Sequence, residues 1–256
     1  MPADGPAVLV TRPAGEAAER LVAAIEAAGL RVVHQPLLEL EPIAEPSADD
    51  QALLRALADY QHVIFVSANA VRFGMLWLQR HWPVLPQPPL WYAVGDATAA
   101  LLAEQGVEVF TPGRDMTSEG LLALPGLRDV AGARVLIVKG EGGRDTLATE
   151  LAARGATVAV LACYRRVAPV LPAGALGQRL EAEKVAAVLL SSGEGLENFR
   201  RLLSPSESSK FTGLRLIVPS DRVAKLAREA GFDNIVTADN ASDAAMCRAL
   251  GVNAGE

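Results

Sequence analysis

The chain has 256 residues, of which 50% are hydrophobic and 21% charged, a composition typical of a globular protein rather than a disordered one. Its formal net charge is -6 and it has no basic run, which argues against a nucleic-acid surface because phosphate binding needs clustered Lys and Arg. Apolar runs such as 63–66 and 188–190 are far too short to span a membrane, so we expect a small-molecule partner, no nucleic acid and no membrane.

Short apolar runs alternate with amphipathic helical patterns along the first half of the chain. In chain order we expect strand 7–11, helix 17–28, strand 31–35, a helix from Ser47, strand 62–67, helix 70–80, strand 91–94, helix 97–105, strand 108–111 and a short helix from Ser118. Ser47 and Asp50 have the spacing of a capping box, with Asp in place of the usual Glu. Strands that are apolar on both faces and alternate with helices are typical of parallel sheets covered on each side, so the predicted fold class is α/β.

From Arg134 the same order of elements begins again. The matching segments are 135–139 with 8–12, 187–192 with 62–67, and 224–231 with 99–106. The register is nearly constant over the last two matches, which indicates an internal duplication. Residues 124–132 lie between the two halves, and we interpret them as a surface join, a connecting segment at the surface of the protein.

In two segments, 32–42 and 159–169, a strand continues directly, without a turn, into an extended connector that is bounded by proline. Each follows the same prelude of strand, loop, Ala-rich helix and second strand. We interpret them as links between two similar lobes, with Tyr164 at the mouth of the cleft between the lobes.

The expected cellular setting follows from the termini and the cysteines. Residues 1–5 lack the charged and then apolar layout of a signal peptide. The two cysteines, Cys163 and Cys247, have no metal-ligand spacing, and a reducing compartment suits them. We expect a cytoplasmic monomer.

Open parallel sheets bind ligands beyond the carboxyl ends of their strands, and the side chains expected there are mostly hydroxyls, glycines and cations. These candidate binding residues are Arg12, Ser67, Thr98, Lys139, Gly140, Arg144, Ser191, Ser192 and Ser220. Together with the backbone N–H groups at helix starts, they suit anionic oxygens. One helix terminus contributes only about 0.3–1 kcal/mol, so several would have to surround one polyanion.

Simpler interpretations of these residues stay open. The three serines that also suit helix N-caps are Ser67, Ser192 and Ser220. Arg12 and Arg144 fit surface ion pairs, which usually contribute little. Tyr164 fits an aromatic at a cleft edge whose hydroxyl finds a neighbour.

Sharper motif assignments fail. Gly140 to Gly143 suggests a dinucleotide loop, but the next strand ends without the Asp or Glu that binds ribose. Lys139 lacks the following Ser or Thr and the upstream glycine of a P-loop, and no Gly-x-Ser-x-Gly elbow occurs. The three histidines are scattered, so we expect no metal. The residues alone predict a two-lobed α/β protein that binds an anionic small molecule.

Eight segments, in this order and spacing, resemble the uroporphyrinogen-III synthase family over nearly the whole chain. They are 8–13, 36–39, 66–71, 93–99, 118–122, 140–144, 160–165 and 190–193. The resemblance implies two flavodoxin-like domains joined by a two-stranded linker, with the substrate between them. The implied domains are 1–36 with 168–256, and 40–164, with linkers near 37–42 and 164–169.

The resemblance also implies a reaction. The linear tetrapyrrole hydroxymethylbilane loses its terminal hydroxyl as water, its last pyrrole ring is inverted, and the macrocycle closes to uroporphyrinogen III, with no metal or organic cofactor. Tyr164 matches the family's tyrosine and is expected to assist the loss of water, by proton transfer or by a hydrogen bond. The cations expected to face the acetate and propionate groups of the substrate are Arg12, Lys139, Arg144 and Arg165.

One departure from the family pattern lies in the second half. Val223 stands at the position where some members of the family have a threonine, which leaves Ser220 as the candidate substitute.

Two other functions are weighed against this one. The alternative function is that of a non-catalytic two-lobed protein that closes on an anionic ligand, whereas a nucleotide-binding enzyme is disfavoured by the failed loop motifs.

Overall fold

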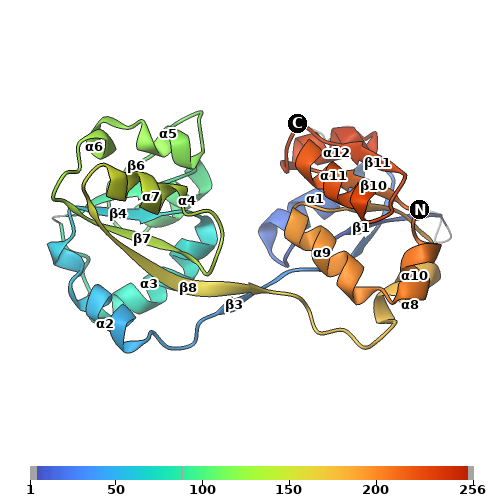
Figure 1. The fold of residues 1–256 in the computed structure, drawn as a ribbon, viewed down its shortest axis with the longest axis horizontal. Helices are drawn as coiled ribbons and strands as arrows, with labels where there is room; N and C mark the ends of the chain where they lie inside the picture. The colour runs from blue at the N-terminus through green and yellow to red at the C-terminus, as the bar shows by residue number, and fades with distance from the viewer. Residues whose placement is uncertain (1–4, 88, 253–256) are drawn as a thin grey trace. The chain divides into compact units, whose positions relative to one another are not determined.

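In the computed structural model, which describes residues 5–87 and 89–252, the chain divides into two compact units (Figure 1). Unit 1 consists of Met1–Glu39 with Val167–Glu256, and unit 2 of Leu40–Arg166. The first domain expected from the sequence includes residues 1–4 and 253–256, which lie outside the described residues. Within the described ranges, no helix has the length and apolarity that crossing a membrane requires.

The sheet of unit 1 has five strands in the order β11-β10-β9-β1-β2, and every neighbouring pair is parallel. Its strands are β1 (Ala7–Val10), β2 (Arg31–His34), β9 (Val185–Leu189), β10 (Arg215–Val218) and β11 (Ile235–Thr237). Its helices are α1 (Glu16–Ala27), α8 (Ala175–Ala182), α9 (Gly193–Leu202), α10 (Pro205–Lys210), α11 (Asp221–Glu229) and α12 (Asp243–Leu250). Because side chains alternate along a strand, Leu9 packs with α8, α9 and α11, while Val8 and Val10 pack with α1 and α12 on the other face.

The sheet of unit 2 has the order β3-β8-β7-β4-β5-β6, and the five strands from β8 to β6 run parallel to one another. Its strands are β3 (Glu39–Pro42), β4 (His62–Phe65), β5 (Leu90–Ala93), β6 (Val109–Phe110), β7 (Arg134–Gly140) and β8 (Thr157–Val167). Its helices are α2 (Ala48–Arg55), the 3-10 helix η1 (Leu57–Asp59), α3 (Ala68–His81), α4 (Asp96–Ala103), α5 (Ser118–Leu122), α6 (Pro125–Arg128) and α7 (Thr146–Ala153). Apolar side chains of α2, α3 and α4 cover one face, and those of α5, α6 and α7 the other. The predicted α/β class is confirmed.

The two sheets have the same arrangement, which confirms the predicted duplication. Written as β2-β1-β9-β10-β11 and β8-β7-β4-β5-β6, they match strand for strand, and both have the flavodoxin-like order when β1 and β7 are taken first. The registers agree as well: Val8 pairs with Ala187, and Val135 pairs with His62. These are the same two pairs of positions that the sequence repeat equates.

Strand β8, the long yellow strand in Figure 1, runs without a turn from Thr157 to Val167, as its sequence predicts. It carries a β-bulge near its carboxyl end. Lys139 of β7 lies opposite Ala162, whereas the next residue, Gly140, lies opposite Tyr164. Cys163 is therefore the extra residue, and a bulge of this kind changes the direction in which the following side chain points.

Two local predictions had different outcomes. The capping box is confirmed, since Ser47 and Asp50 each accept the backbone N–H of the other at the start of α2. The interpretation of 124–132 as a surface join is confirmed for most of its residues, since 125–126, 128–129 and 131–132 are exposed, but the segment is also anchored to the core. This segment contains α6, and Leu127 and Val130 are almost fully buried because they pack against the inner side chains of β7.

Tyr60 is 1% exposed, and the described part of the chain offers its hydroxyl no hydrogen-bond partner. The Arg134 guanidinium lies over its ring, with Cζ 4.7 Å from the centroid. Burying an unsatisfied hydroxyl costs roughly 1–3 kcal/mol, so we expect Tyr60→Phe to raise the free energy of unfolding by about 1 kcal/mol in urea denaturation. Tyr92→Phe is the matched control, because Tyr92 Oη lies 3.2 Å from His62 Nδ1 and its loss is expected to lower stability. Equal losses in the two variants would contradict the prediction.

Candidate functional site

A pocket of about 310 Å³ lies at the carboxyl ends of the strands of unit 2. Its polar lining includes Ser67 after β4, Lys139 and Gly140 at the end of β7, Arg144, Tyr164 and Arg166. The chain leaves β7 toward β8 on one side and leaves β4 toward β5 on the other. The pocket therefore lies at the topological switch point of the sheet, where open parallel sheets bind ligands.

Tyr164 is held from three directions. It is 8% exposed, and its ring centroid lies 5.4 Å from that of Phe73 on α3. A Cβ atom on Gly140 would lie 2.6 Å from Tyr164 Cζ, so only a glycine leaves room for the ring there. Tyr164 Oη lies 3.2 Å from Ser67 Oγ. The phenol is thus fixed at the wall of the pocket.

Ser67 is the N-cap of α3, as its simpler interpretation predicts. Its Oγ accepts the backbone N–H of Ala70 at 3.1 Å. The capping contact leaves the O–H of Ser67 and one oxygen lone pair for Tyr164 or for a ligand.

The cations around the pocket have acidic or backbone neighbours. Lys139 Nζ lies 3.0 Å from Asp145 Oδ1, and the Lys139 side chain is only 12% exposed. Arg144 pairs with Glu119 at 3.5 Å, and both side chains are mostly exposed. The exposed pair is easily exchanged for a ligand carboxylate, because surface ion pairs contribute little to stability.

Arg165 and Arg166 lie on different sides of β8. Arg166 lines the pocket, and a Cβ on Gly143 would lie 3.5 Å from its Nη2. Arg165 is absent from the described lining and pairs with Glu141 at 3.4 Å. Because strand side chains alternate, Arg166 shares the side of Tyr164 and Arg165 does not.

Cys163, the extra residue of the bulge, is buried under α3. Its Sγ lies 3.6 Å from the Ala70 carbonyl oxygen and 3.4 Å from that of Lys139. Burial raises the pKa of the Cys163 thiol to about 12, with backbone hydrogen bonding as a smaller opposing effect. The thiol therefore stays protonated and serves packing rather than nucleophilic chemistry.

Thr98 lies in the first turn of α4 and is only 5% exposed. Its backbone N–H donates to the carbonyl of Gly95 at 3.0 Å, and its side chain is not part of the described pocket lining. Thr98 is thus a buried residue outside the described pocket lining.

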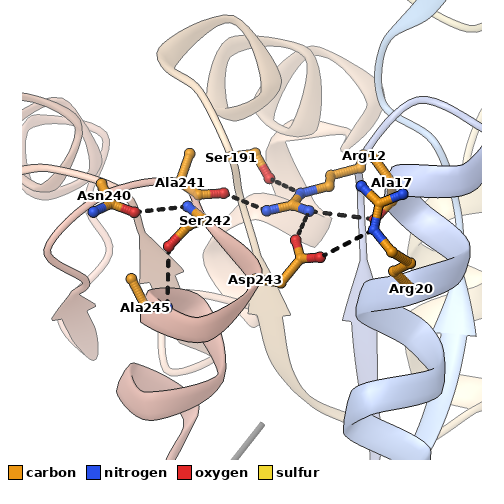
Figure 2. Close-up of polar contacts among 9 residues, drawn as sticks. All are labelled: Arg12, Ala17, Arg20, Ser191, Asn240, Ala241, Ser242, Asp243 and Ala245. Atoms are coloured by element: carbon orange, nitrogen blue, oxygen red, sulfur yellow. Dashed lines mark hydrogen bonds and ion pairs between the residues drawn. The ribbon is translucent and has the colours of Figure 1, made fainter. Parts of the chain in front are cut away.

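The corresponding switch point of unit 1, between β1 and β9, is filled by Arg12 (Figure 2). Arg12 Nε donates to Ser191 Oγ at 3.1 Å, and Nη1 donates to the Ala17 carbonyl at 3.3 Å and to the Asp243 carboxylate. Nη2 donates to the Ala241 carbonyl. The side chain is 11% exposed, so this guanidinium binds together β1, α1, the loop after β9 and the start of α12.

The remaining serines of unit 1 have structural contacts. Ser192 Oγ accepts the N–H of Gly195 at 3.0 Å as the N-cap of α9, and Ser220 Oγ accepts that of Val223 at 3.5 Å as the N-cap of α11. Their capping interpretation is confirmed. Binding of a ligand by either stays a prediction.

The two copies of the duplicated crevice have diverged. Arg12 and Lys139 occupy equivalent positions, and each bonds an aspartate near the start of a following helix. The Arg12 fork reaches four partners, whereas the single ammonium of Lys139 reaches Asp145 and the carbonyl of Arg144. Unit 2 keeps an open pocket beside Tyr164.

Arg12→Ala is expected to lower the free energy of unfolding by about 2 kcal/mol, because it leaves the half-buried Asp243 carboxylate without its main cation. Thermal and urea unfolding measure the loss. Arg144→Ala is the control, since its ion pair is exposed and its removal should not change stability measurably. Equal stabilities of Arg12→Ala and the unmodified chain would contradict the network's structural role.

Three residues of these sites are not among those predicted from the sequence. Phe73 can be recognised as a neighbour of Tyr164 only once α3 is known to pack on β8. Asp243 lies 231 residues from Arg12 in the sequence. Arg166 follows from strand alternation after Tyr164, a signal that the sequence does contain. Among residues 5–87 and 89–252, no group of His, Cys, Asp or Glu has the arrangement of a metal site.

Comparison with known proteins gives one consistent result. A family model described as uroporphyrinogen-III synthase HemD matches residues 19–248. The uroporphyrinogen-III synthases of Escherichia coli K12 and Salmonella typhimurium LT2 are each 38% identical to the chain and cover 95% of it, with 99% of each relative matched.

Solved structures agree on the fold. A mutant uroporphyrinogen III synthase from the extremely thermophilic bacterium Thermus thermophilus matches with a TM-score of 0.58 at 20% identity, over 96% of this chain and 99% of that one. The uroporphyrinogen-III synthetase of Helicobacter pylori 26695 matches with a TM-score of 0.61 at 16% identity, over the same shares. At these identities the likeness concerns the fold alone.

Proposed function

The chain belongs to the uroporphyrinogen-III synthase HemD family, and from that premise we propose that the pocket of unit 2 receives its substrate, hydroxymethylbilane. The chain is a cyclising lyase: it closes this linear tetrapyrrole to uroporphyrinogen III with inversion of ring D and loss of water. The proposal concerns which residues carry out the reaction. It is supported by the convergence of a fixed phenol, a capped helix start and three basic side chains at one switch point.

Lys139, Arg144 and Arg166 are proposed to hold acetate and propionate groups of the substrate. An acidic chain binds a polyanion only where its cations are gathered, and these three line one pocket. A substrate carboxylate replaces Glu119 at the exposed guanidinium of Arg144, where a two-pronged contact is available. Lys139 keeps Asp145 and adds positive potential from the pocket wall. Gly140 leaves the space in which the Tyr164 ring lies, and we assign it no ligand contact of its own.

Tyr164 is proposed to assist the loss of water. Hydroxide is a poor leaving group, so the hydroxymethyl oxygen must receive a proton or a strong hydrogen bond as its bond to carbon breaks. The phenol O–H supplies one at a fixed place beside the carboxylate-binding cations. The rest of the rate acceleration comes from residues of the chain that hold the substrate in the geometry of ring closure, without a metal or an organic cofactor.

The domain organisation is part of the proposal. We take units 1 and 2 as the two domains of the family fold, with linkers near 37–42 and 164–169. The boundaries between the units, after Glu39 and after Arg166, support this division. Ser191, Ser192, Ser220, Arg12, Thr98 and Arg165 stay predicted substrate contacts, of which Arg12 and Ser191 would first have to leave their mutual hydrogen bond.

The chain is further proposed to work as a monomer in the cytoplasm. Its two free cysteines are buried, which suits a reducing compartment. Light scattering of the purified chain measures the oligomeric state, and a dimer mass would contradict this part of the proposal.

The activity is tested by incubating the purified chain with freshly made hydroxymethylbilane and separating the cyclic products by chromatography. We expect the type III isomer with the chain, and the spontaneous mixture in buffer and with heat-denatured chain. A product mixture that the native chain leaves unchanged would contradict the activity and favour a binding protein.

A further inference from the structure

The two hydroxyls at the pocket wall form one hydrogen bond whose direction decides what Tyr164 can do. Ser67 Oγ and Tyr164 Oη lie 3.2 Å apart, and either atom is able to donate. If Tyr164 donates, its proton is bound to Ser67 and is not available to a ligand. If Ser67 donates, the proton of Tyr164 is available to a ligand.

The capping contact favours donation by Ser67. Ser67 Oγ already accepts the N–H of Ala70 at 3.1 Å, so one of its two lone pairs is occupied, while its own O–H still requires an acceptor. Tyr164 Oη provides that acceptor. We infer that Ser67 is a positioning residue whose O–H donates to Tyr164 Oη and thereby directs the O–H of Tyr164 into the pocket.

The surroundings of Tyr164 leave its ring little freedom to change this arrangement. Phe73 lies against the ring with a centroid distance of 5.4 Å, and Gly140 leaves only the space that the ring fills. Helix α3 carries both Ser67 as its N-cap and Phe73 further along the helix. One helix therefore fixes both the plane of the phenol and the direction of its proton.

This inference rests on the proposed function, in which Tyr164 assists dehydration. The C–O bond of the hydroxymethyl group breaks, its electron pair stays with the oxygen, and that oxygen takes the phenol proton and leaves as water. The carbon left behind is stabilised by the pyrrole nitrogen lone pair. Negative charge develops on Tyr164 Oη, and the hydrogen bond from Ser67 strengthens at that moment. The phenol regains a proton when ring closure releases one from a pyrrole carbon.

A donor that strengthens only in the transition state raises kcat and leaves KM nearly unchanged. We expect loss of the Ser67 O–H to lower kcat by about tenfold, the size of one charge-assisted hydrogen bond after partial compensation by solvent. Loss of the cap alone would lower stability without this selective effect on kcat.

Three substitutions separate the donor from the cap. Ser67→Thr keeps both, Ser67→Asp keeps the cap but has no O–H to donate when ionised, and Ser67→Gly removes the hydroxyl at little cost to the cap. Each is assayed for kcat and KM of type III product formation, alone and combined with Tyr164→Phe, after thermal unfolding has shown that it folds. We expect activity close to the unmodified chain for Thr and about tenfold lower kcat for Asp and Gly, with a raised KM for Asp alone because its carboxylate repels those of the substrate. Neither Asp nor Gly should lower kcat further in the Tyr164→Phe background.

The outcomes distinguish the donor role of Ser67 from the proposed role of Tyr164 in dehydration. If Tyr164→Phe slows the reaction while Ser67→Gly and Ser67→Asp do not, the donor role of Ser67 is overturned and that of Tyr164 stands. If Tyr164→Phe leaves the rate unchanged, the proposed role of Tyr164 fails first. Equal losses from Ser67→Gly with and without the Tyr164 hydroxyl show that Ser67 acts independently of Tyr164, which also overturns the inference. Should Ser67→Asp fail to fold, Ser67→Gly alone decides.

Discussion

Tyr164→Phe is expected to slow formation of the type III isomer by about 10- to 100-fold. The phenylalanine ring keeps the contacts with Phe73 and fills the space beside Gly140, so the fold and the pocket walls stay as they are. Only the oxygen is lost, together with its 3.2 Å contact to Ser67. A hydrogen bond to the leaving oxygen accounts for about tenfold, and proton transfer for about 100-fold or more, so the size of the loss shows which one Tyr164 provides.

The measurement is the initial rate of type III product, from which spontaneous cyclisation in buffer is subtracted. KM is expected to change little, because the proposed carboxylate contacts come from the basic side chains rather than from the phenol. Tyr60→Phe serves as the control, since Tyr60 is a buried phenol of unit 2 outside the described pocket lining. A Tyr164→Phe enzyme as fast as the Tyr60→Phe enzyme would remove Tyr164 from the mechanism.

The strands were predictable because their signals are local. A strand buried on both faces must be a continuous apolar run, as at Ala7–Val10 and His62–Phe65. The duplication adds long-range information that a single sequence rarely holds. The repeat equates 135–139 with 8–12 and 187–192 with 62–67. The pairing of β7 with β4 therefore corresponds to the pairing of β1 with β9, and the observed registers of the two pairs agree.

The details of the site depend on contacts that leave no local signal. The bulge at Cys163 exists only as a mismatch between β7 and β8, so it cannot be read from either strand alone. The same applies to Arg12, whose exposure to substrate was expected from its position after β1. Its carboxylate partner, Asp243, starts a helix near the far end of the chain, and only the fold brings the two together.

The two crevices differ in the basic side chain that occupies the repeated position. A guanidinium has five donors in a rigid fork and satisfies several carbonyls and a carboxylate at once, which closes the crevice of unit 1 around Arg12. An ammonium is a single point of charge, and Lys139 is turned toward Asp145 at the pocket wall. At this repeated position, unit 1 thus has a side chain that joins four partners, and unit 2 has one that forms part of a pocket wall.

Gly140→Ala is expected to lower kcat by about 10- to 100-fold, as much as Tyr164→Phe does, because a misplacement of the reacting group by about 1 Å is enough for a loss of up to about 100-fold. The new Cβ would lie 2.6 Å from Cζ and 2.7 Å from Cε2 of Tyr164, closer than real side chains approach. The ring is rigid, and Phe73 and Ser67 hold it from other directions, so the phenol oxygen has to leave its place. The backbone of Gly140 does not lie in the left-handed region, so alanine adds no strain of its own.

The control for this substitution is Gly213→Ala in unit 1, where a Cβ would meet no described heavy atom within 4 Å. It should leave kcat unchanged. The decisive comparison uses Tyr164→Ala, in which the ring that collides with the new methyl group is absent. If Gly140 acts only through the position of the phenol, Gly140→Ala has no further effect on kcat in that background. A loss of the same size that persists without the Tyr164 ring would instead assign Gly140 a direct contact with the substrate.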